Sequence, residues 1–183
     1  MNELILKFEI FINSLRDNES RNSLFDFIWK KYYRKLKYYI VRNFNFHPQD
    51  IDEMIQEIMI RIYNNLEKYD LIHSFNTWFY TIARNYCIDA IKRKGFDMTT
   101  EESELPDDKN EGYQFLEKKE LNGIIERALS SLNRIDSEIL YLRYYESMKI
   151  NEISGIINVP GGTVKSRLFY LKKKLRDELK EEL

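Results

Sequence analysis

Two adjacent glycines near the end of the chain are followed by a dense set of hydrogen-bond donors and cations. Five basic residues lie between Lys165 and Lys174, in the run KSRLFYLKKK, and no acidic residue lies among them. A helix that begins near these glycines turns about 100° per residue and points several side chains away from its apolar stripe. These are Lys165, Ser166, Phe169, Tyr170 and Lys173, with Arg167 and Lys174 on the flank. Such a face offers donors to base edges and cations to phosphates, so it favours nucleic-acid binding.

Two short helices joined by a tight turn must position this face. Apolar residues recur at Ile150, Ile153 and Ile157, the stretch NVPGG interrupts the pattern, and a second apolar stripe follows. The second stripe consists of Val164, Leu168, Leu171, Leu175 and Leu179. A helix-turn-helix needs this arrangement, because the stripe holds the recognition helix on its domain while the N-terminal end enters the major groove. If the positive charge is considered alone, the alternative to a recognition helix is a surface helix whose lysines are merely solvated.

An isoleucine on the polar face of another predicted helix suggests a protein interface. In the segment DIDEMIQEIMIRIYNNL, Asp50 and Glu53 are spaced as a capping box, and Glu57 and Arg61 as an ion pair. The buried stripe consists of Ile51, Ile55, Ile58 and Ile62. Ile60 lies on the opposite face, within a polar ring of Glu53, Gln56, Glu57 and Asn64. An apolar centre with a polar rim is typical of a site for a helical partner, although single exposed isoleucines are also common on surfaces.

The outer side of the next predicted helix combines cations and amides next to aromatic rings. Ser74 is placed to cap this helix. The predicted core face consists of Phe75, Trp78, Phe79, Ile82, Ala83 and Tyr86. The outer side carries Asn76, Thr77, Arg84, Asn85, Asp89, Lys92 and Arg93, after the loop from Tyr69 to His73. Cations, amides and aromatic rings in this arrangement suit single-stranded or melted nucleic acid, whose bases stack or enter pockets. The alternative is that these residues form an ordinary solvated helix end.

The spacing of apolar residues predicts an all-α fold in two parts. Helices are expected near 4–16, 21–45, 50–67, 74–94, 114–131, 135–145, 150–157 and 161–181. Residues 95–112 contain seven acidic residues against one lysine and have no apolar face, which is typical of a flexible linker. The chain is therefore expected to form two small helical domains, 1–94 and 113–183, joined by this acidic linker.

The composition excludes several classes of protein. With 29 Lys and Arg against 30 Asp and Glu, the formal net charge is −1, so an anionic partner must be bound by local patches. The single cysteine, Cys87, cannot form an internal disulfide and is expected to be a buried thiol. His47 and His73 do not suffice for a conventional zinc site. Because neither a leader nor a membrane-spanning run is recognisable, we expect a cytoplasmic protein without metal, cofactor or membrane insertion.

Both halves of the chain resemble the sigma factors of bacterial RNA polymerase, of the extracytoplasmic-function type (group 4 of the sigma-70 family). DIDEMIQEIMIRIYNNLEKYD resembles conserved region 2.2, and SFNTWFYTIARNYCIDAIKRK resembles regions 2.3 and 2.4. INEISGIINVPGGTVKSRLFYLKKKL resembles region 4.2, so the motifs follow the family's order over nearly the whole chain. Two positions depart from the family pattern: Lys149 stands where a helix-capping serine is usual, and Tyr170 where a basic residue is common.

The resemblance implies an alternative sigma factor that binds core RNA polymerase and directs promoter-specific initiation. Core binding, through the clamp helices of the largest subunit, is implied for Asp52, Gln56, Glu57, Ile60 and Arg61. Contacts with the minus-35 element are implied for Thr163, Lys165, Ser166, Arg167, Phe169, Tyr170 and Lys173. Contacts with the melted minus-10 strand are implied for Tyr69, His73, Ser74, Asn76, Thr77, Arg84, Asn85 and Lys92. The polymerase flap and an anti-sigma factor are the further partners that the resemblance implies.

Two other functions stay open on the residues alone. A helix-turn-helix regulator would bind duplex operators as a homodimer without polymerase, but it leaves the first half of the chain unexplained. A nuclease with a DNA-binding tail would need carboxylates clustered in metal-ligand geometry, whereas the acidic residues here are spread over helix faces and the linker. No set of residues combines a nucleophile, a base and an oxyanion site, so no catalytic residue is predicted.

Overall fold

The structure of the protein is a computed structural model that describes residues 18–70, 72–94, 129 and 131–182. Within these ranges every regular element is helical, and the chain divides into two compact units, Met1–Pro106 and Asp107–Leu183. The predicted fold, all-α with two domains, is confirmed. The helix expected near 4–16, the acidic linker and nearly all of the helix expected near 114–131 lie outside the described residues.

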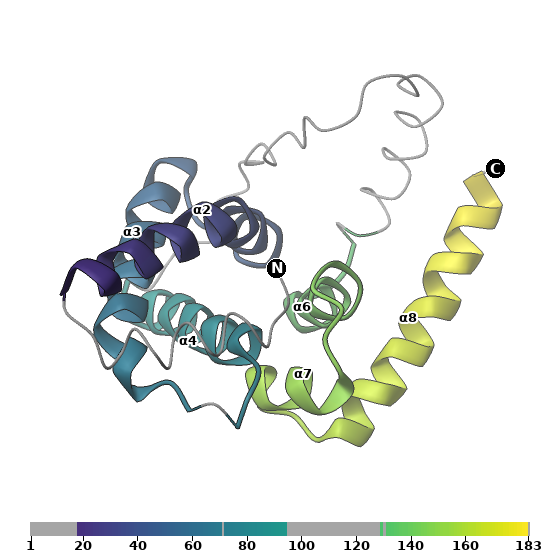
Figure 1. The fold of residues 1–183 in the computed structure, drawn as a ribbon. Helices are drawn as coiled ribbons and strands as arrows, with labels where there is room; N and C mark the ends of the chain where they lie inside the picture. Colours follow the sequence, from purple (N-terminus) through teal and green to yellow (C-terminus); the bar gives the residue numbers. More distant parts are fainter. Residues whose placement is uncertain (1–17, 71, 95–128, 130, 183) are drawn as a thin grey trace, which may run out of the picture. The chain divides into compact units, whose positions relative to one another are not determined.

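Helices α2 and α3 lie side by side in the first unit. The described elements of this unit are α2 (Asn18–Asn43), α3 (Pro48–Asn65), the 3-10 turn η1 (Leu66–Lys68) and α4 (Phe75–Lys94), shown in Figure 1. α2 and α3 run antiparallel. At one end Arg21 donates to the carbonyl oxygen of Tyr63 over 2.9 Å, and at the other Lys37 donates to Asp52 over 2.9 Å. α4 packs against the side of α3.

Aromatic rings from α2 and α4 form the centre of the first unit. The Tyr32 ring stacks on Phe79 with centroids 4.4 Å apart, and the Tyr39 ring meets Tyr80 edge to face at 5.1 Å. All four side chains are fully buried. Ring pairs of this kind add to the stability that apolar burial provides. The cluster holds α4 against α2 and thereby fixes which side of α4 points outward.

The core face predicted for α4 is confirmed in part. Phe75, Phe79 and Ala83 are buried, whereas Trp78, Ile82 and Tyr86 are only half-buried. Tyr80, outside the predicted face, is fully buried. Two helices, α2 and α3, both pack against α4. The buried surface of α4 is therefore wider than a single stripe. Cys87 is a buried thiol, as expected.

The start of α3 differs from the sequence prediction. The predicted capping box of Asp50 and Glu53 is wrong, because the helix begins at Pro48 and its N-cap residue is His47, in an extended conformation. Proline suits the first helical position, where its missing N–H would have had no acceptor within the helix. Asp50 lies in the first turn instead, where the helix dipole favours a negative charge.

The second unit packs two helices against a third that carries a wide turn. Its described elements are α6 (Arg134–Leu140), the π-helical turn η2 (Tyr141–Tyr145), α7 (Ile150–Ile157) and α8 (Gly161–Glu182). α6 contacts both α7 and α8 (Figure 1). The shared core includes Ile139, Leu142, Ile153, Ile157, Val164 and Leu168. The predicted stripe of α8 is confirmed at Val164, Leu168 and Leu171, which are buried, and Leu175 is half-buried.

The helix expected over 135–145 changes its geometry halfway. The backbone N–H of Glu146 donates to the carbonyl oxygen of Tyr141, five residues back, over 3.2 Å. Ser147 then adopts a left-handed conformation with φ 55°, and the N–H of Met148 donates to Leu142 over 2.9 Å. These bonds end the helix and direct the chain into α7. An apolar pattern of period 3.6 does not reveal a wide turn, because the turn keeps Tyr141 and Leu142 buried.

Candidate nucleic-acid and protein interfaces

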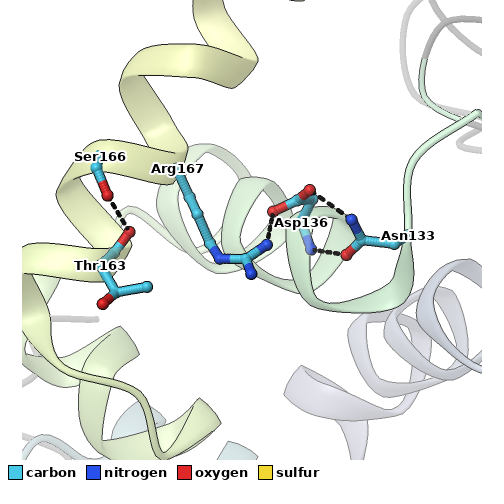
Figure 2. Close-up of polar contacts among 5 residues, drawn as sticks. All are labelled: Asn133, Asp136, Thr163, Ser166 and Arg167. Atoms are coloured by element: carbon cyan, nitrogen blue, oxygen red, sulfur yellow. Dashed lines mark hydrogen bonds and ion pairs between the residues drawn. The ribbon is translucent and has the colours of Figure 1, made fainter.

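The outward face of α8 is arranged as the periodicity predicts. The side opposite the buried stripe presents Lys165, Ser166, Phe169, Tyr170 and Lys173 to solvent. Thr163, in the first turn, is half-buried, and its carbonyl oxygen accepts a hydrogen bond from the Ser166 hydroxyl over 3.0 Å (Figure 2). The structure therefore brings most of the predicted minus-35 residues onto one accessible surface at the start of a helix.

Arg167 differs from these residues because it has an ion-pair partner within the unit. Its Nη1 donates to Oδ1 of Asp136, on α6, over 2.7 Å (Figure 2). Asn133, the N-cap residue of α6, donates to Oδ2 of Asp136 over 2.6 Å and accepts from the Asp136 backbone N–H over 3.1 Å. The side chain of Asp136 is only 15% exposed, against 38% for Arg167. These contacts tie the beginning of α8 to the beginning of α6.

Sequence reasoning missed Asn133 and Asp136. Their spacing of three residues is a recognisable capping signal, but it says nothing of Arg167, which lies 31 residues after Asp136. A contact of Arg167 with DNA stays a prediction.

The turn between α7 and α8 depends on one left-handed residue. Asn158 ends α7 with φ 56° and ψ 49°, and its N–H donates to the carbonyl oxygen of Ser154. The Ser154 hydroxyl donates to the carbonyl oxygen of Val159 over 2.6 Å. At the start of α7, the backbone N–H of Lys149 donates to the Glu152 carboxylate over 2.8 Å. Half of a capping box is thus present although Lys149 replaces the usual serine.

Replacing Asn158 tests the importance of this turn. Asn158→Ala is expected to destabilise the second unit by about 1 kcal/mol, because alanine is strained in the left-handed region that asparagine tolerates. Asn158→Gly is the matched control and should keep the original stability, since glycine adopts positive φ without a steric cost. Amide hydrogen exchange of α7 and α8 in the full chain measures both effects. Equal protection in the two variants would contradict the prediction.

The outer face of α3 has the apolar centre and polar surround that the sequence predicts. Ile60 is 50% exposed, and Gln56 and Glu57 beside it are exposed as well. The guanidinium of Arg61 lies over the ring of Tyr86, on α4, 4.7 Å from its centroid. Arg61 makes this contact instead of the predicted ion pair with Glu57. A cation over an aromatic ring keeps its charge at the surface while its position is fixed.

Asp52, at the start of the same face, is held by α2. Its Oδ1 accepts hydrogen bonds from Lys37 over 2.9 Å and from the Tyr33 hydroxyl over 3.1 Å. The bond from Lys37 is the main cause that lowers the pKa of Asp52 below its ordinary value, and it also raises the pKa of Lys37. Asp52 therefore adds stability while it is ionised, and this contribution is lost as the pH falls through its lowered pKa. The contribution is small, because the Asp52 side chain is 58% exposed and solvent screens the pair.

A braced loop leads into α4, where the sequence predicts contacts with a melted strand. Tyr69 is buried against Phe75, and its hydroxyl donates to the carbonyl oxygen of His73 over 2.7 Å. Ser74 caps α4 as predicted, since its hydroxyl oxygen accepts from the N–H of Thr77 over 3.2 Å. Tyr69, Ser74 and Thr77 thus shape the loop, while the side chain of His73 is exposed.

The remaining predicted residues of this region differ in their accessibility. Asn85 and Lys92 are exposed on the outer side of α4, Arg84 is half-buried, and Asn76 accepts a hydrogen bond from the buried Tyr32 hydroxyl. Ile72 is 85% exposed beside His73, and sequence reasoning gave it no separate role. A short loop has no periodicity from which such exposure could be predicted.

Among the described residues, no group of three or more His, Cys, Asp or Glu side chains is placed to hold a metal ion. Of the helices in the same part of the chain, none combines the length and the hydropathy needed to cross a bilayer.

Comparison with protein families identifies both units. The family model for sigma-70 region 2 matches residues 28–96, and the model for sigma-70, region 4 matches residues 122–175. The first match spans α2 from residue 28 onward together with α3 and α4, and so includes the Ile60 face and the braced loop. The second spans α6, α7 and the start of α8.

Individual proteins are similar along most of the chain. The ECF RNA polymerase sigma factor SigW of Bacillus subtilis (strain 168) is 29% identical over 143 residues, covering 72% of this chain and 76% of SigW. The ECF RNA polymerase sigma-E factor of Escherichia coli (strain K12) is 28% identical over 135 residues, covering 66% of this chain and 69% of that protein. The structure of CnrH in complex with the cytosolic domain of CnrY has a similar fold, with a TM-score of 0.62, 15% identity and coverage of 97% and 98%.

Proposed function

Because this chain belongs to the sigma-70 family of RNA polymerase sigma factors, in the extracytoplasmic-function group, we propose that its two units divide promoter recognition between them. The chain is an alternative sigma factor that directs promoter-specific transcription. Members of the family are initiation factors and are not known as enzymes, so the proposal gives this chain no catalytic step. We assign residues 1–94 to core binding and the minus-10 element, and residues 113–183 to the minus-35 element, with 95–112 as the linker.

In this proposal, the outer face of α3 binds the clamp helices of the largest polymerase subunit. The observation that carries it is Ile60, a half-exposed apolar side chain with Gln56 and Glu57 beside it. A partner helix that covers Ile60 removes its apolar area from water while polar groups pair at the rim. Asp52, held by Lys37, and Arg61, held over an aromatic ring, offer charges of opposite sign along the same face.

The two DNA elements are bound by different surfaces. The second unit binds duplex minus-35 DNA, with the start of α8 in the major groove, Ser166 toward base edges and Lys165 and Lys173 toward phosphates. The first unit binds the melted minus-10 strand along the loop at His73 and the outer side of α4, where Lys92 is exposed. The polymerase flap is the proposed protein partner of the second unit.

We also propose that this protein acts in the cytoplasm and that an anti-sigma factor controls it. The proposed anti-sigma factor is supported by the likeness in fold between this chain and CnrH, a protein whose structure was solved in complex with the cytosolic domain of CnrY. A partner that covers the α3 face or the α8 face would block the corresponding proposed contact with polymerase or promoter.

Reconstitution with core RNA polymerase on a library of promoters tests the proposed function. We expect the purified chain to bind core polymerase and to direct initiation at a subset of promoters that share a minus-35 and a minus-10 element. Footprints at the minus-35 element should depend on the second unit. Stable binding of the free chain to duplex operators, without any association with core polymerase, would contradict the proposal and indicate an ordinary helix-turn-helix regulator.

A further inference from the structure

Two neighbouring aromatic side chains on α8 are unusually accessible. Phe169 and Tyr170 are each 68% exposed, more than any other large apolar or aromatic side chain in the described part of the second unit. Their rings meet edge to face, with centroids 5.8 Å apart and planes at 78°. This geometry is favoured for aromatic pairs, so each ring restricts the orientation of the other. The pair therefore forms an exposed apolar surface in which the two rings have a defined mutual orientation.

The surroundings of the pair favour duplex DNA as the partner that covers it. Lys165, Ser166 and Lys173 are exposed on the same face of α8. The centre of a protein interface is depleted in lysine, whereas cations on both sides of an apolar contact complement the two phosphate backbones that border a groove. The nearby cation Lys172 has a different contact, because its Nζ lies over the ring of Tyr144, 5.7 Å from the centroid.

Only one base offers an apolar group in the major groove, and that group is the 5-methyl of thymine. We propose that Tyr170, oriented by Phe169, recognises the 5-methyl group of a thymine in the minus-35 element. The inference rests on the proposed function and adds the chemistry of one recognised base pair. Arginine and lysine in the major groove prefer guanine, whereas the exposed ring of Tyr170 offers an apolar surface that suits a methyl group.

Deoxyuridine tests the contact directly, because it keeps the Watson–Crick pair of thymine but lacks the methyl group. Promoters are first selected from a random library with the reconstituted holoenzyme, and each minus-35 thymine is then replaced singly by deoxyuridine. We expect one replacement to lower the affinity of the holoenzyme about 4-fold, the size expected from burial of one methyl group. Tyr170→Ala should lower affinity for the thymine promoter by at least as much, and it should abolish the difference between thymine and deoxyuridine.

Two matched variants complete the experiment. Tyr170→Phe keeps the ring and should retain the difference between thymine and deoxyuridine. Tyr144→Ala removes another exposed tyrosine of the same unit, outside α8, and should retain the difference between thymine and deoxyuridine. The inference is overturned if no minus-35 thymine is sensitive to loss of its methyl group. It is also overturned if the sensitivity persists in Tyr170→Ala, or if Tyr144→Ala removes it equally well.

Failure of the inference is distinguishable from failure of the proposed function. If the chain were not a sigma factor, the holoenzyme would select no promoters at the first step. If it is one, promoters are selected, and the deoxyuridine comparison reports only on the methyl contact. Because that comparison uses the unaltered chain, it does not depend on the folding of any variant.

Discussion

Ile60→Glu is expected to lower the affinity for core RNA polymerase by about 2 kcal/mol or more, which is about 30-fold. The reason is the position of Ile60 at the apolar centre of the α3 face, where a partner helix would have to bury the new carboxylate. A buried charge without a partner loses its hydration and gains nothing in return. Titration of core polymerase with a fluorescently labelled chain, in the absence of DNA, measures the effect.

The fold is expected to tolerate this substitution, because Ile60 is 50% exposed and its helix is held by residues on the other side. Far-ultraviolet circular dichroism and thermal denaturation should therefore match those of the original chain. Ile72→Glu is a matched control, since it places the same charge at an isoleucine that is 85% exposed and lies outside the proposed core-binding face. Unchanged core affinity of Ile60→Glu, or an equal loss in both variants, would remove Ile60 from the interface.

Arg167→Ala is expected to have two effects that can be separated. The first is on stability, because Asp136 is only 15% exposed and loses the cation that neutralises it. A poorly solvated carboxylate that loses its cation and keeps only the hydrogen bond from Asn133 lowers the free energy of unfolding by about 1–3 kcal/mol. The second effect follows from the predicted phosphate contact. Promoter affinity should fall for all sequences, and the slope of log affinity against log salt should become shallower by about 1.

A double variant distinguishes these effects. Asp136→Ala in the Arg167→Ala background removes the carboxylate that has lost its cation and is expected to restore most of the lost stability, since replacing both members of an ion pair is much less costly than removing one. Promoter affinity should stay low in the double variant. If stability and affinity recover together, Arg167 serves only to hold α8 on α6 and is not a DNA contact.

Local patterns in the sequence were sufficient to predict which sides of α3 and α8 are buried. The stripe at Val164, Leu168 and Leu171 is a repeat within one helix, so it predicts which side of α8 is buried without any knowledge of the partner helices. The exposed position of Ile60 follows by the same reasoning on α3. The family assignment also came from local motifs, and the matches to both sigma-70 regions confirm it.

Contacts between distant segments could not be predicted in this way. Arg167 is a residue of the type that contacts DNA phosphates. Only the packing of α8 on α6 places its Nη1 2.7 Å from Oδ1 of Asp136. The bond between Lys37 and Asp52 likewise depends on the register of two antiparallel helices. The start of α3 was predicted incorrectly for a different reason, because a capping box and a proline at the first helical position compete within a few residues. The residue roles at the interfaces themselves stay predictions.

The loop before α4 has a consequence for the kinetics of promoter opening. Its hydrogen bonds, from Tyr69 to His73 and from the Ile72 N–H to Asp70, already exist in the free protein. Fixing the backbone of one residue costs about 1–2 kcal/mol in conformational entropy, and for the residues held by these two bonds that cost falls on folding rather than on the proposed binding of the strand. In the proposed contact with the melted minus-10 strand, these bonds spare the loop part of its rearrangement, so the lifetime of the unpaired base, more than loop motion, is expected to set the rate of capture.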